Sequence, residues 1–242
     1  MRTIALISIT VAAVLAASAA RAENPVVRMV TPLGDIEIEL CNEISTLCLG
    51  VAPNSVANFL SYVDSGAYEG SFIHRAVSGF VNQGGSFKAN GVSLPETQVQ
   101  TQAPIASEFN QSNLRGTVSI PLPGASQCDT EENAGTSGWF INLSDANAAL
   151  DCGLFTVFGV VRTGMDVADA INLRFRVNWG LGPTPVTADY VCAPIPPSTG
   201  CTTDPVPWLI YTDITRVPEA SAALQSLSAA LALATLARRR KG

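Results

Sequence analysis

The stretch FIHRAVSGFVNQGGSF, residues 72–87, contains the only histidine of the 242-residue chain, with an arginine directly after it. Alternate residues of a strand face opposite sides, so His74 and Arg75 are expected to point to different faces. A mid-strand arginine with Phe80 and Gln83 a few residues on predicts a half-apolar groove with one cation, one amide and one aromatic wall. The residues offer this groove no obvious nucleophile and no pair of carboxylates. On the residues alone, an Arg75 that is tied to a buried acid remains an equal alternative.

Outward from this stretch, the sequence alternates short strands with turns. Residues 26–30 and 35–40 flank a turn, and the strict alternation of DIEIEL is typical of a half-buried antiparallel hairpin. One helix is expected to begin at Pro53 and end at Gly66, and a second is expected at residues 165–171. Further strands are expected at residues 72–75, 80–83, 117–120, 138–143, 155–161 and 208–217. Many short strands with two helices indicate a closed or nearly closed β architecture, which hides its strand edges.

Residues 1–22, MRTIALISITVAAVLAASAARA, predict a secretory signal peptide. One early arginine is followed by an apolar run, and Ala20-Arg21-Ala22 fits the A-x-A cleavage pattern. Glu23 is then the first residue of the mature chain. An uncleaved membrane anchor is the alternative, but the apolar run is short for a membrane span.

Residues 217–242 are interpreted as a second targeting segment. An Ala- and Leu-rich stretch precedes Arg238-Arg239-Arg240-Lys241, and a basic cluster of this kind stays in the cytoplasm. A surface amphipathic helix is the alternative, but the stretch lacks a charged face. The tail resembles the bacterial PEP-CTERM sorting signal, although its opening motif Val217-Pro218-Glu219-Ala220 ends in Ala where the signal has Pro. The resemblance implies transient inner-membrane anchoring, then export to the periplasm, cell surface or extracellular matrix of a Gram-negative bacterium.

Residues 23–216 remain as one domain, long enough to bury a sizeable core. This range carries eight Lys and Arg against 19 Asp and Glu, a net charge of −11. So acidic a domain lacks the basic surface that nucleic-acid binding needs. Its charge also disfavours binding to anionic membranes.

The six cysteines of the chain fall into three neighbouring pairs, Cys41 with Cys48, Cys128 with Cys152, and Cys192 with Cys201. An even number of cysteines behind a signal peptide favours disulfides. We predict this local pairing, although six cysteines allow 15 connectivities. Metal binding is disfavoured because the chain offers one histidine and no C-x-x-C.

The sequence resembles the cyclophilin family along most of this domain. Upstream of residues 72–87, GDIEIEL and APNSVANFLSYVDSGAYEG resemble the family's opening strands and first helix. Downstream, RGTVSI, SGWFINL, ALD, FTVFGVV and GMDVADAI follow in the family's order. The resemblance covers about residues 26–172 and the closing strand near 208–217. The family signature F-H-R-V-I-P-x-F-x-x-Q-G-G-D-F is matched in register by His74, Arg75, Phe80, Gln83, Gly84, Gly85 and Phe87.

This resemblance implies a closed eight-stranded antiparallel barrel capped by two α-helices. It also implies a monomeric peptidyl-prolyl cis–trans isomerase without metal, cofactor or covalent intermediate, acting on proline-containing peptides and unfolded exported proteins. Arg75 would be catalytic, because a guanidinium that donates to the prolyl nitrogen weakens the amide resonance that slows rotation. Gln83 would orient the arginine or the substrate. His74 is counted among the substrate-binding residues as a neighbour of the site that transfers no proton. The apolar pocket for the proline ring would comprise Phe80, Val81, Phe140, Leu150 and Phe155.

Three positions near the expected groove depart from the family pattern. Gly138, which we count among the substrate-binding positions, stands where the family usually has a glutamine that contacts substrate. Pro121 has no N–H, so the strand edge there can pair less with a peptide. Ala149 replaces a common aromatic residue, which predicts weak cyclosporin binding at best.

These departures support an alternative function. A cyclophilin-fold binding module would grip proline-containing segments and turn them over poorly. A third class, a hydrolase that uses His74 with a serine and an aspartate, is disfavoured because the chain has no G-x-S-x-G motif.

Overall fold

A computed structural model of the chain describes residues 23–89, 97–126, 128–130, 133–177, 186–188 and 209–218. Its helices are α1 (Pro53–Asp64), the 3-10 helix η1 (Asp145–Gly153) and α2 (Met165–Asn172). Its strands are β1 (Val26–Thr31), β2 (Gly34–Leu40), β3 (Ser71–Phe72), β4 (Arg75–Val77), β5 (Val81–Gly84), β6 (Phe87–Lys88), β7 (Thr97–Gln98), β8 (Thr117–Ser119), β9 (Gly124–Ser126), β10 (Asp129–Thr130), β11 (Trp139–Asn142), β12 (Val157–Thr163), β13 (Phe175–Val177), β14 (Val186–Ala188) and β15 (Tyr211–Arg216).

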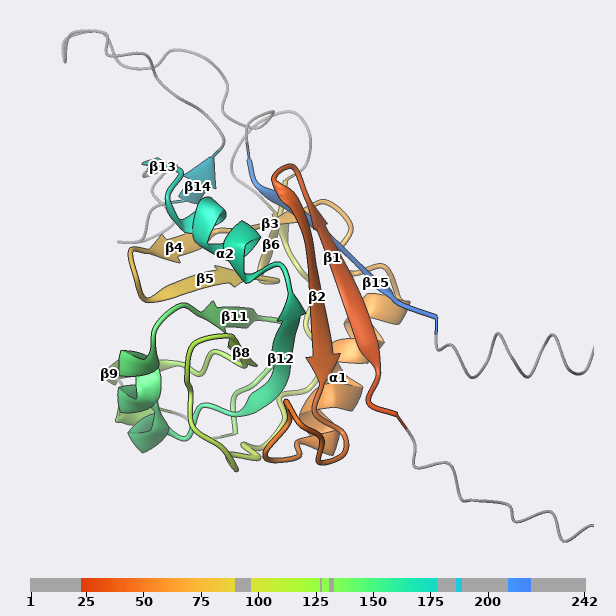
Figure 1. The fold of residues 1–242 in the computed structure, drawn as a ribbon, viewed down its shortest axis with the longest axis vertical. Helices are drawn as coiled ribbons and strands as arrows, with labels where there is room; N and C mark the ends of the chain where they lie inside the picture. Colours follow the sequence, from red (N-terminus) through yellow and green to blue (C-terminus); the bar gives the residue numbers. More distant parts are fainter. Residues whose placement is uncertain are drawn as a thin grey trace, which may run out of the picture.

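Eleven strands form one antiparallel sheet, in the order β4-β5-β11-β8-β12-β2-β1-β15-β3-β6-β7. β3 and β4 follow each other in the chain but lie far apart in this order, so the sheet has to curl back on itself (Figure 1). Ile73 and His74, which link β3 to β4, form backbone hydrogen bonds to two distant parts of the sheet. Ile73 N–H donates to Ile210 O at 2.9 Å, and His74 N–H donates to Gln83 O at 3.1 Å.

The predicted fold class is confirmed, since the described part of the chain is mainly β, with a curled antiparallel sheet and two α-helices. The sheet has eleven strands where eight were predicted, and its end strands β4 and β7 do not pair with each other, so it is curled and not closed as predicted. The difference in strand number arises because pieces of two or three residues, such as β3, β4 and β6, count as separate strands.

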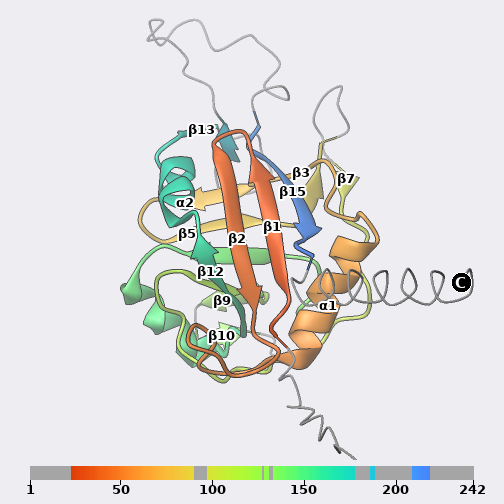
Figure 2. The same cartoon turned by 45° about the vertical axis from the view of Figure 1, so that its right-hand side comes forward.

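The main core lies between the curled sheet and α1, which runs beside β1 and β15 (Figure 2). The helical spacing predicted for this segment is confirmed, because Val56, Phe59, Leu60 and Val63 are all buried. The Phe59 ring meets the Phe158 ring of β12 at a centroid distance of 4.9 Å. Burial of such apolar side chains supplies most of the stabilisation of a fold of this size.

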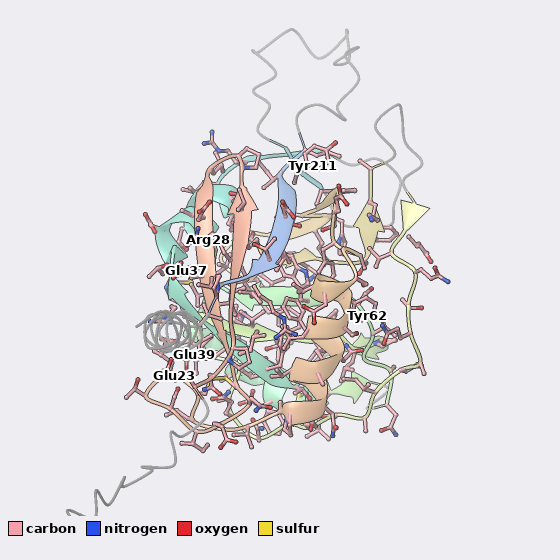
Figure 3. All side chains as sticks on the ribbon, turned by 90° about the vertical axis from the view of Figure 1, so that its right-hand side faces the viewer. Glu23, Arg28, Glu37, Glu39, Tyr62 and Tyr211 are labelled. Atoms are coloured by element: carbon pink, nitrogen blue, oxygen red, sulfur yellow. A yellow bond between two sulfur atoms is a disulfide. The ribbon has the colours of Figure 1, made fainter. Side chains whose placement is uncertain are left out.

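The β1–β2 hairpin is also confirmed, with Thr31 opposite Gly34 at its turn. Ile36, Ile38 and Leu40 are fully buried, whereas the acidic residues between them are on the other face. Arg28 on β1 and Glu37 on β2 lie on that outer face (Figure 3), with the Arg28 Nη2 to Glu37 Oε1 distance at 3.1 Å. Exposed ion pairs of this kind contribute little to stability.

Two of the three predicted disulfides are present. Cys41–Cys48 closes the loop after β2, and Cys128–Cys152 joins the long loop before β11 to η1. Cys192 and Cys201 lie outside the described residues, as do most of the two predicted targeting segments. No helix in the described part of the chain is long and apolar enough to cross a membrane.

Candidate active site

The β4–β5 hairpin brings Arg75 and Gln83 side by side, because the antiparallel register pairs these two residues directly. Arg75 Nη1 donates to Gln83 Oε1 at 3.3 Å, and the guanidinium carbon lies 5.9 Å from the centroid of the Phe80 ring. The Arg75 side chain is half-buried, and this burial lowers its pKa. Arginine nevertheless stays protonated in proteins, so the groove carries a fixed positive charge.

No carboxylate within the described ranges forms an ion pair with Arg75. The alternative that this arginine is tied to a buried acid therefore finds no support there. The guanidinium instead retains donors beyond the one that bonds Gln83, since arginine has five N–H groups.

The residues predicted to hold the proline ring form an apolar cluster beside this arginine, here called the pocket cluster. Phe140 and Phe155 meet edge to face, with ring centroids 5.9 Å apart and an interplanar angle of 77°. Half-buried Phe80 and Leu122 pack against this cluster. The buried members of the cluster are Val81, Phe140, Leu150 and Phe155.

This cluster brings together all five of the predicted pocket residues, which come from four separate parts of the chain. Leu122 is a sixth member that sequence reasoning missed. It lies in the Pro-Leu-Pro segment just after β8, and only the pairing of β8 with β11 carries it to the pocket.

Gly84 and Gly85 are adjacent glycines because the Trp139 indole covers them. A Cβ atom on Gly84 would lie 2.5 Å from Trp139 Cζ2, and one on Gly85 would lie 2.6 Å from Trp139 Cδ1. The indole is fully buried and belongs to β11, the strand paired with β5. In the Gln-Gly-Gly run, Gln83 therefore contributes a side chain to the groove. The two glycines let the Trp139 indole pack directly on the backbone.

Gly138 and Pro121, two of the departures noted above, are in contact. Phe140 is paired with Ser119, so extending that antiparallel register by two residues sets Gly138 opposite Pro121. A Cβ atom on Gly138 would lie 2.7 Å from Pro121 Cγ and 3.2 Å from Ser86 Oγ. The structure therefore places buried Gly138 behind the proline ring, and not in the pocket cluster.

His74 lies on the opposite side of the strand from the groove. Its ring is buried and meets the Phe87 ring edge to face, at a centroid distance of 5.0 Å. Burial lowers the pKa of His74 to about 4, and the positive charge of Arg75 adds to this effect. Its Nδ1 finds no hydrogen-bond partner in the part of the chain that the structure describes. A neutral, enclosed ring of this kind suits packing rather than proton transfer near pH 7.

Comparisons with known proteins identify the family of the chain. The family model described as "Cyclophilin type peptidyl-prolyl cis-trans isomerase/CLD" matches residues 26–186. Peptidyl-prolyl cis-trans isomerase A of Dickeya dadantii is 38% identical over 152 residues, covering 60% of this chain and 70% of that protein. A peptidyl-prolyl cis-trans isomerase of Acinetobacter baylyi is 38% identical over 154 residues, covering 61% and 72%.

The fold has solved counterparts as well. A crystal structure of a Cryptosporidium parvum cyclophilin type peptidyl-prolyl cis-trans isomerase superposes with a TM-score of 0.53 at 21% identity, covering 81% of this chain and 99% of that chain. A second structure of that isomerase, in the presence of the dipeptide Ala-Pro, gives a TM-score of 0.52. Because the family model matches residues 26–186 of the 242-residue chain, the chain belongs to the cyclophilin-type peptidyl-prolyl cis-trans isomerases.

Proposed function

We propose that this protein catalyses cis–trans isomerisation of X-Pro bonds in exported proteins. The observation that carries the proposal is a half-buried Arg75 beside an apolar pocket, held by Gln83 and stacked near Phe80. This arrangement supplies a fixed cation beside clustered apolar side chains, and these are the two kinds of group that rotation about a prolyl bond needs.

The chemistry follows from the electronic structure of the amide bond. Resonance gives the C–N bond partial double-bond character, and the rotation barrier is about 18–20 kcal/mol. A guanidinium N–H that donates to the prolyl nitrogen holds its lone pair out of the resonance and lowers this barrier. Arg75 has the donor for this step, and its bond to Gln83 Oε1 limits the orientations that the guanidinium can adopt.

The pocket holds the proline ring while the remainder of the bond rotates. Phe80, Phe140 and Phe155 present aromatic surface from different elements, and Leu150 lies among them. No bond to substrate is made or broken, so the reaction requires neither a nucleophile nor a proton donor. His74 is then a packing residue of the strand that carries Arg75.

A second candidate function is a binding module with little turnover. The contact between Gly138 and Pro121 favours it, because this part of the groove presents a proline ring without a backbone N–H. A module of this kind would bind proline-containing peptides and leave their isomerisation rate almost unchanged.

The experiment that separates the two is NMR exchange spectroscopy on an Ala-Pro peptide with a catalytic amount of the disulfide-intact protein. Accelerated cis–trans exchange that is lost in Arg75→Ala is expected of the isomerase. Peptide binding without acceleration by the folded wild-type protein would leave only the binding module.

The export of the protein belongs to the same proposal. Cys41–Cys48 and Cys128–Cys152 suit an oxidising compartment such as the periplasm. We propose cleavage before Glu23 and transient membrane anchoring through residues 217–242. Intact-mass measurement of protein recovered from a Gram-negative host tests this, and a mass that retains residues 1–22 would contradict it.

A further inference from the structure

The turn between β4 and β5 is held by a carboxamide from another element. Asn172, the last residue of α2, accepts a hydrogen bond from Gly79 N–H through its Oδ1 at 3.1 Å. Its Nδ2 lies 3.1 Å from Val77 O and 3.4 Å from Val81 O. One side chain therefore contacts the backbone on both strands and at the turn itself.

The same Asn172 is connected to the strand interior. Its Nδ2 lies 2.8 Å from Asn82 Oδ1, and Asn82 Nδ2 donates to Ala168 O of α2 at 2.8 Å. These bonds fix α2 and β5 to each other in both directions. Figure 1 shows α2 lying over β4 and β5, as this bonding requires.

A second asparagine holds the turn from the opposite side. Asn147 of η1 donates through Nδ2 to Phe80 O at 2.8 Å, and Leu143 N–H donates to the same oxygen at 2.9 Å. Asn147 Nδ2 also lies 2.7 Å from Asn142 Oδ1. Asn142 Nδ2 in turn donates to Thr117 Oγ1 at 2.8 Å, which anchors the network on β8.

Hydrogen bonds from these carboxamides hold the turn at Gly79, where side-chain packing does not. Gly79 has a φ of +62°, and no atom beyond its two chain neighbours lies within 4 Å of where its Cβ would be. Asn147 and Asn172 are both buried, and burial of a carboxamide is costly unless its hydrogen bonds are made. The bonds that offset this cost converge on residues 77–82, the segment that joins Arg75 to Gln83.

We infer that Asn172 and Asn147 are positioning residues that set the Phe80 ring and the Arg75 guanidinium for turnover. The inference rests on the proposed isomerase function. Neither asparagine touches the substrate; both act through the backbone of the turn. Misplacement of reacting groups by a fraction of an ångström slows the chemical step more than it weakens binding.

The test uses Asn172→Ala and Asn172→Asp in the full chain, with line-shape NMR of an Ala-Pro peptide to separate kcat from KM. Asn172→Asp keeps the acceptor for Gly79 N–H but sets a buried carboxylate oxygen against Val77 O, Val81 O and Asn82 Oδ1, which repel it. We expect kcat to fall about tenfold in Asn172→Ala and at least as much in Asn172→Asp, with KM changed less than about twofold. The aromatic signals of Phe80 should shift in both variants.

Asn58→Ala is the matched control. Asn58 is a buried asparagine of α1 whose Nδ2 donates to one backbone carbonyl, Thr136 O, at 2.8 Å, away from the turn. It should lower thermal stability and leave kcat and the Phe80 signals near wild type. Equal loss of kcat in Asn58→Ala and Asn172→Ala, or a wild-type kcat in a folded Asn172→Ala, would overturn the inference.

Two further readouts keep the inference decidable. If Asn172→Ala does not fold, Asn147→Ala removes the bonds to Phe80 O and Asn142 Oδ1 and leaves those of Asn172 in place. It should lower kcat with the same small change in KM. If the wild-type protein binds the peptide without turning it over, the isomerase proposal fails by itself. The Phe80 signals then decide, because unchanged signals in Asn172→Asp would show that Asn172 does not position the ring.

Discussion

The two sides of the groove are built by different kinds of contact. On one, here called the arginine side (Arg75, Phe80 and Gln83), directional hydrogen bonds from Asn172 and Asn147 hold the backbone. On the other, the proline side (Pro121, Leu122 and Gly138), apolar contact and close approach set the shape.

This difference follows from what each side has to do. A guanidinium must point at one nitrogen of the substrate, and hydrogen bonds fix direction as well as distance. An apolar wall needs only to fill space, and different combinations of side chains can fill the same space. The departures at Pro121 and Gly138 both lie on the proline side, where a coupled change can preserve the shape.

Arg75→Ala is expected to have the largest effect, and it tests the arginine side directly. Removal of one preorganised donor lowers turnover by about a hundredfold or more in comparable electrostatic sites. The fold should persist, because no carboxylate in the described ranges depends on Arg75 for an ion pair. Exchange NMR on an Ala-Pro peptide measures the loss, and circular dichroism checks the fold.

Arg75→Lys is the control for charge without geometry. Lysine keeps the cation but has no planar fork to bond Gln83 and the substrate together. We expect turnover between that of Arg75→Ala and that of wild type. A wild-type rate in Arg75→Ala would remove the arginine from the mechanism.

Removal of the Cys128–Cys152 disulfide should destabilise the proline side. This disulfide ties the long loop after β8 to η1, which carries Leu150 of the pocket. Its sequence separation of 24 residues predicts a loss of about 3 kcal/mol in the free energy of unfolding. Urea unfolding of a Cys128→Ser and Cys152→Ser double variant measures it.

Peptide affinity and the Phe80 signals of this double variant show whether the damage is confined to the proline side. We expect weaker binding, since Leu150 loses its anchor, and little change in the Phe80 signals on the arginine side. A shift of those signals as large as that in Asn172→Ala would show that the two sides are not independent.

His74, the residue before Arg75, should make the stability of the protein depend on pH. His74 has an ordinary pKa of 6.5 in the unfolded chain and a pKa of about 4 when folded. The unfolded chain therefore binds more protons between these values, so the free energy of unfolding falls as the pH drops through this window. From pH 7 to about pH 5 the expected loss is about 2 kcal/mol.

Urea unfolding at several pH values measures this loss, and His74→Phe should remove most of it. The chain has no other histidine, so no second imidazole obscures the comparison. An unchanged slope in His74→Phe would mean that other groups cause the acid sensitivity. Turnover should stay nearly constant between about pH 6 and pH 8, because Arg75 keeps its charge and His74 stays neutral.

Local sequence patterns predicted the elements that are defined by neighbours along the chain. The alternation of Ile36, Ile38 and Leu40 identified β2, and the spacing of Val56, Phe59 and Leu60 identified α1. The grouping of Arg75 with Gln83 and Phe80 came from their proximity in one stretch and from the family resemblance.

Features that depend on distant residues were missed. η1 is a 3-10 helix, rich in Ala and Asp, whose residues show no apolar period of 3.6. Asn172 lies 93 residues from Gly79, and only the packing of α2 on β5 brings them together. Leu122 reaches the pocket for a similar reason, through the pairing of β8 with β11.

The smallest expected effect is on stability, and it compares Gly138 of the proline side with Gly79 in the turn of the arginine side. A methyl group on Gly138 would lie 2.7 Å from Pro121 Cγ, whereas one on Gly79 would meet nothing but would hold a φ of +62°. Each single change, Gly138→Ala or Gly79→Ala, should cost about 1–2 kcal/mol in the free energy of unfolding. The causes differ, because Gly138 provides space and Gly79 permits a backbone conformation.

Pro121→Ala separates these two causes. Without the proline ring, a methyl group on Gly138 no longer overlaps it, so Pro121→Ala with Gly138→Ala should show a coupling of about 1 kcal/mol in urea unfolding. The same cycle with Gly79→Ala should be additive within about 0.5 kcal/mol. Additivity in the Gly138 cycle would mean that Gly138 and Pro121 changed independently. Coupling there means that a glutamine at position 138 requires a smaller residue at 121, so that restoring peptide contacts on the proline side takes both substitutions together.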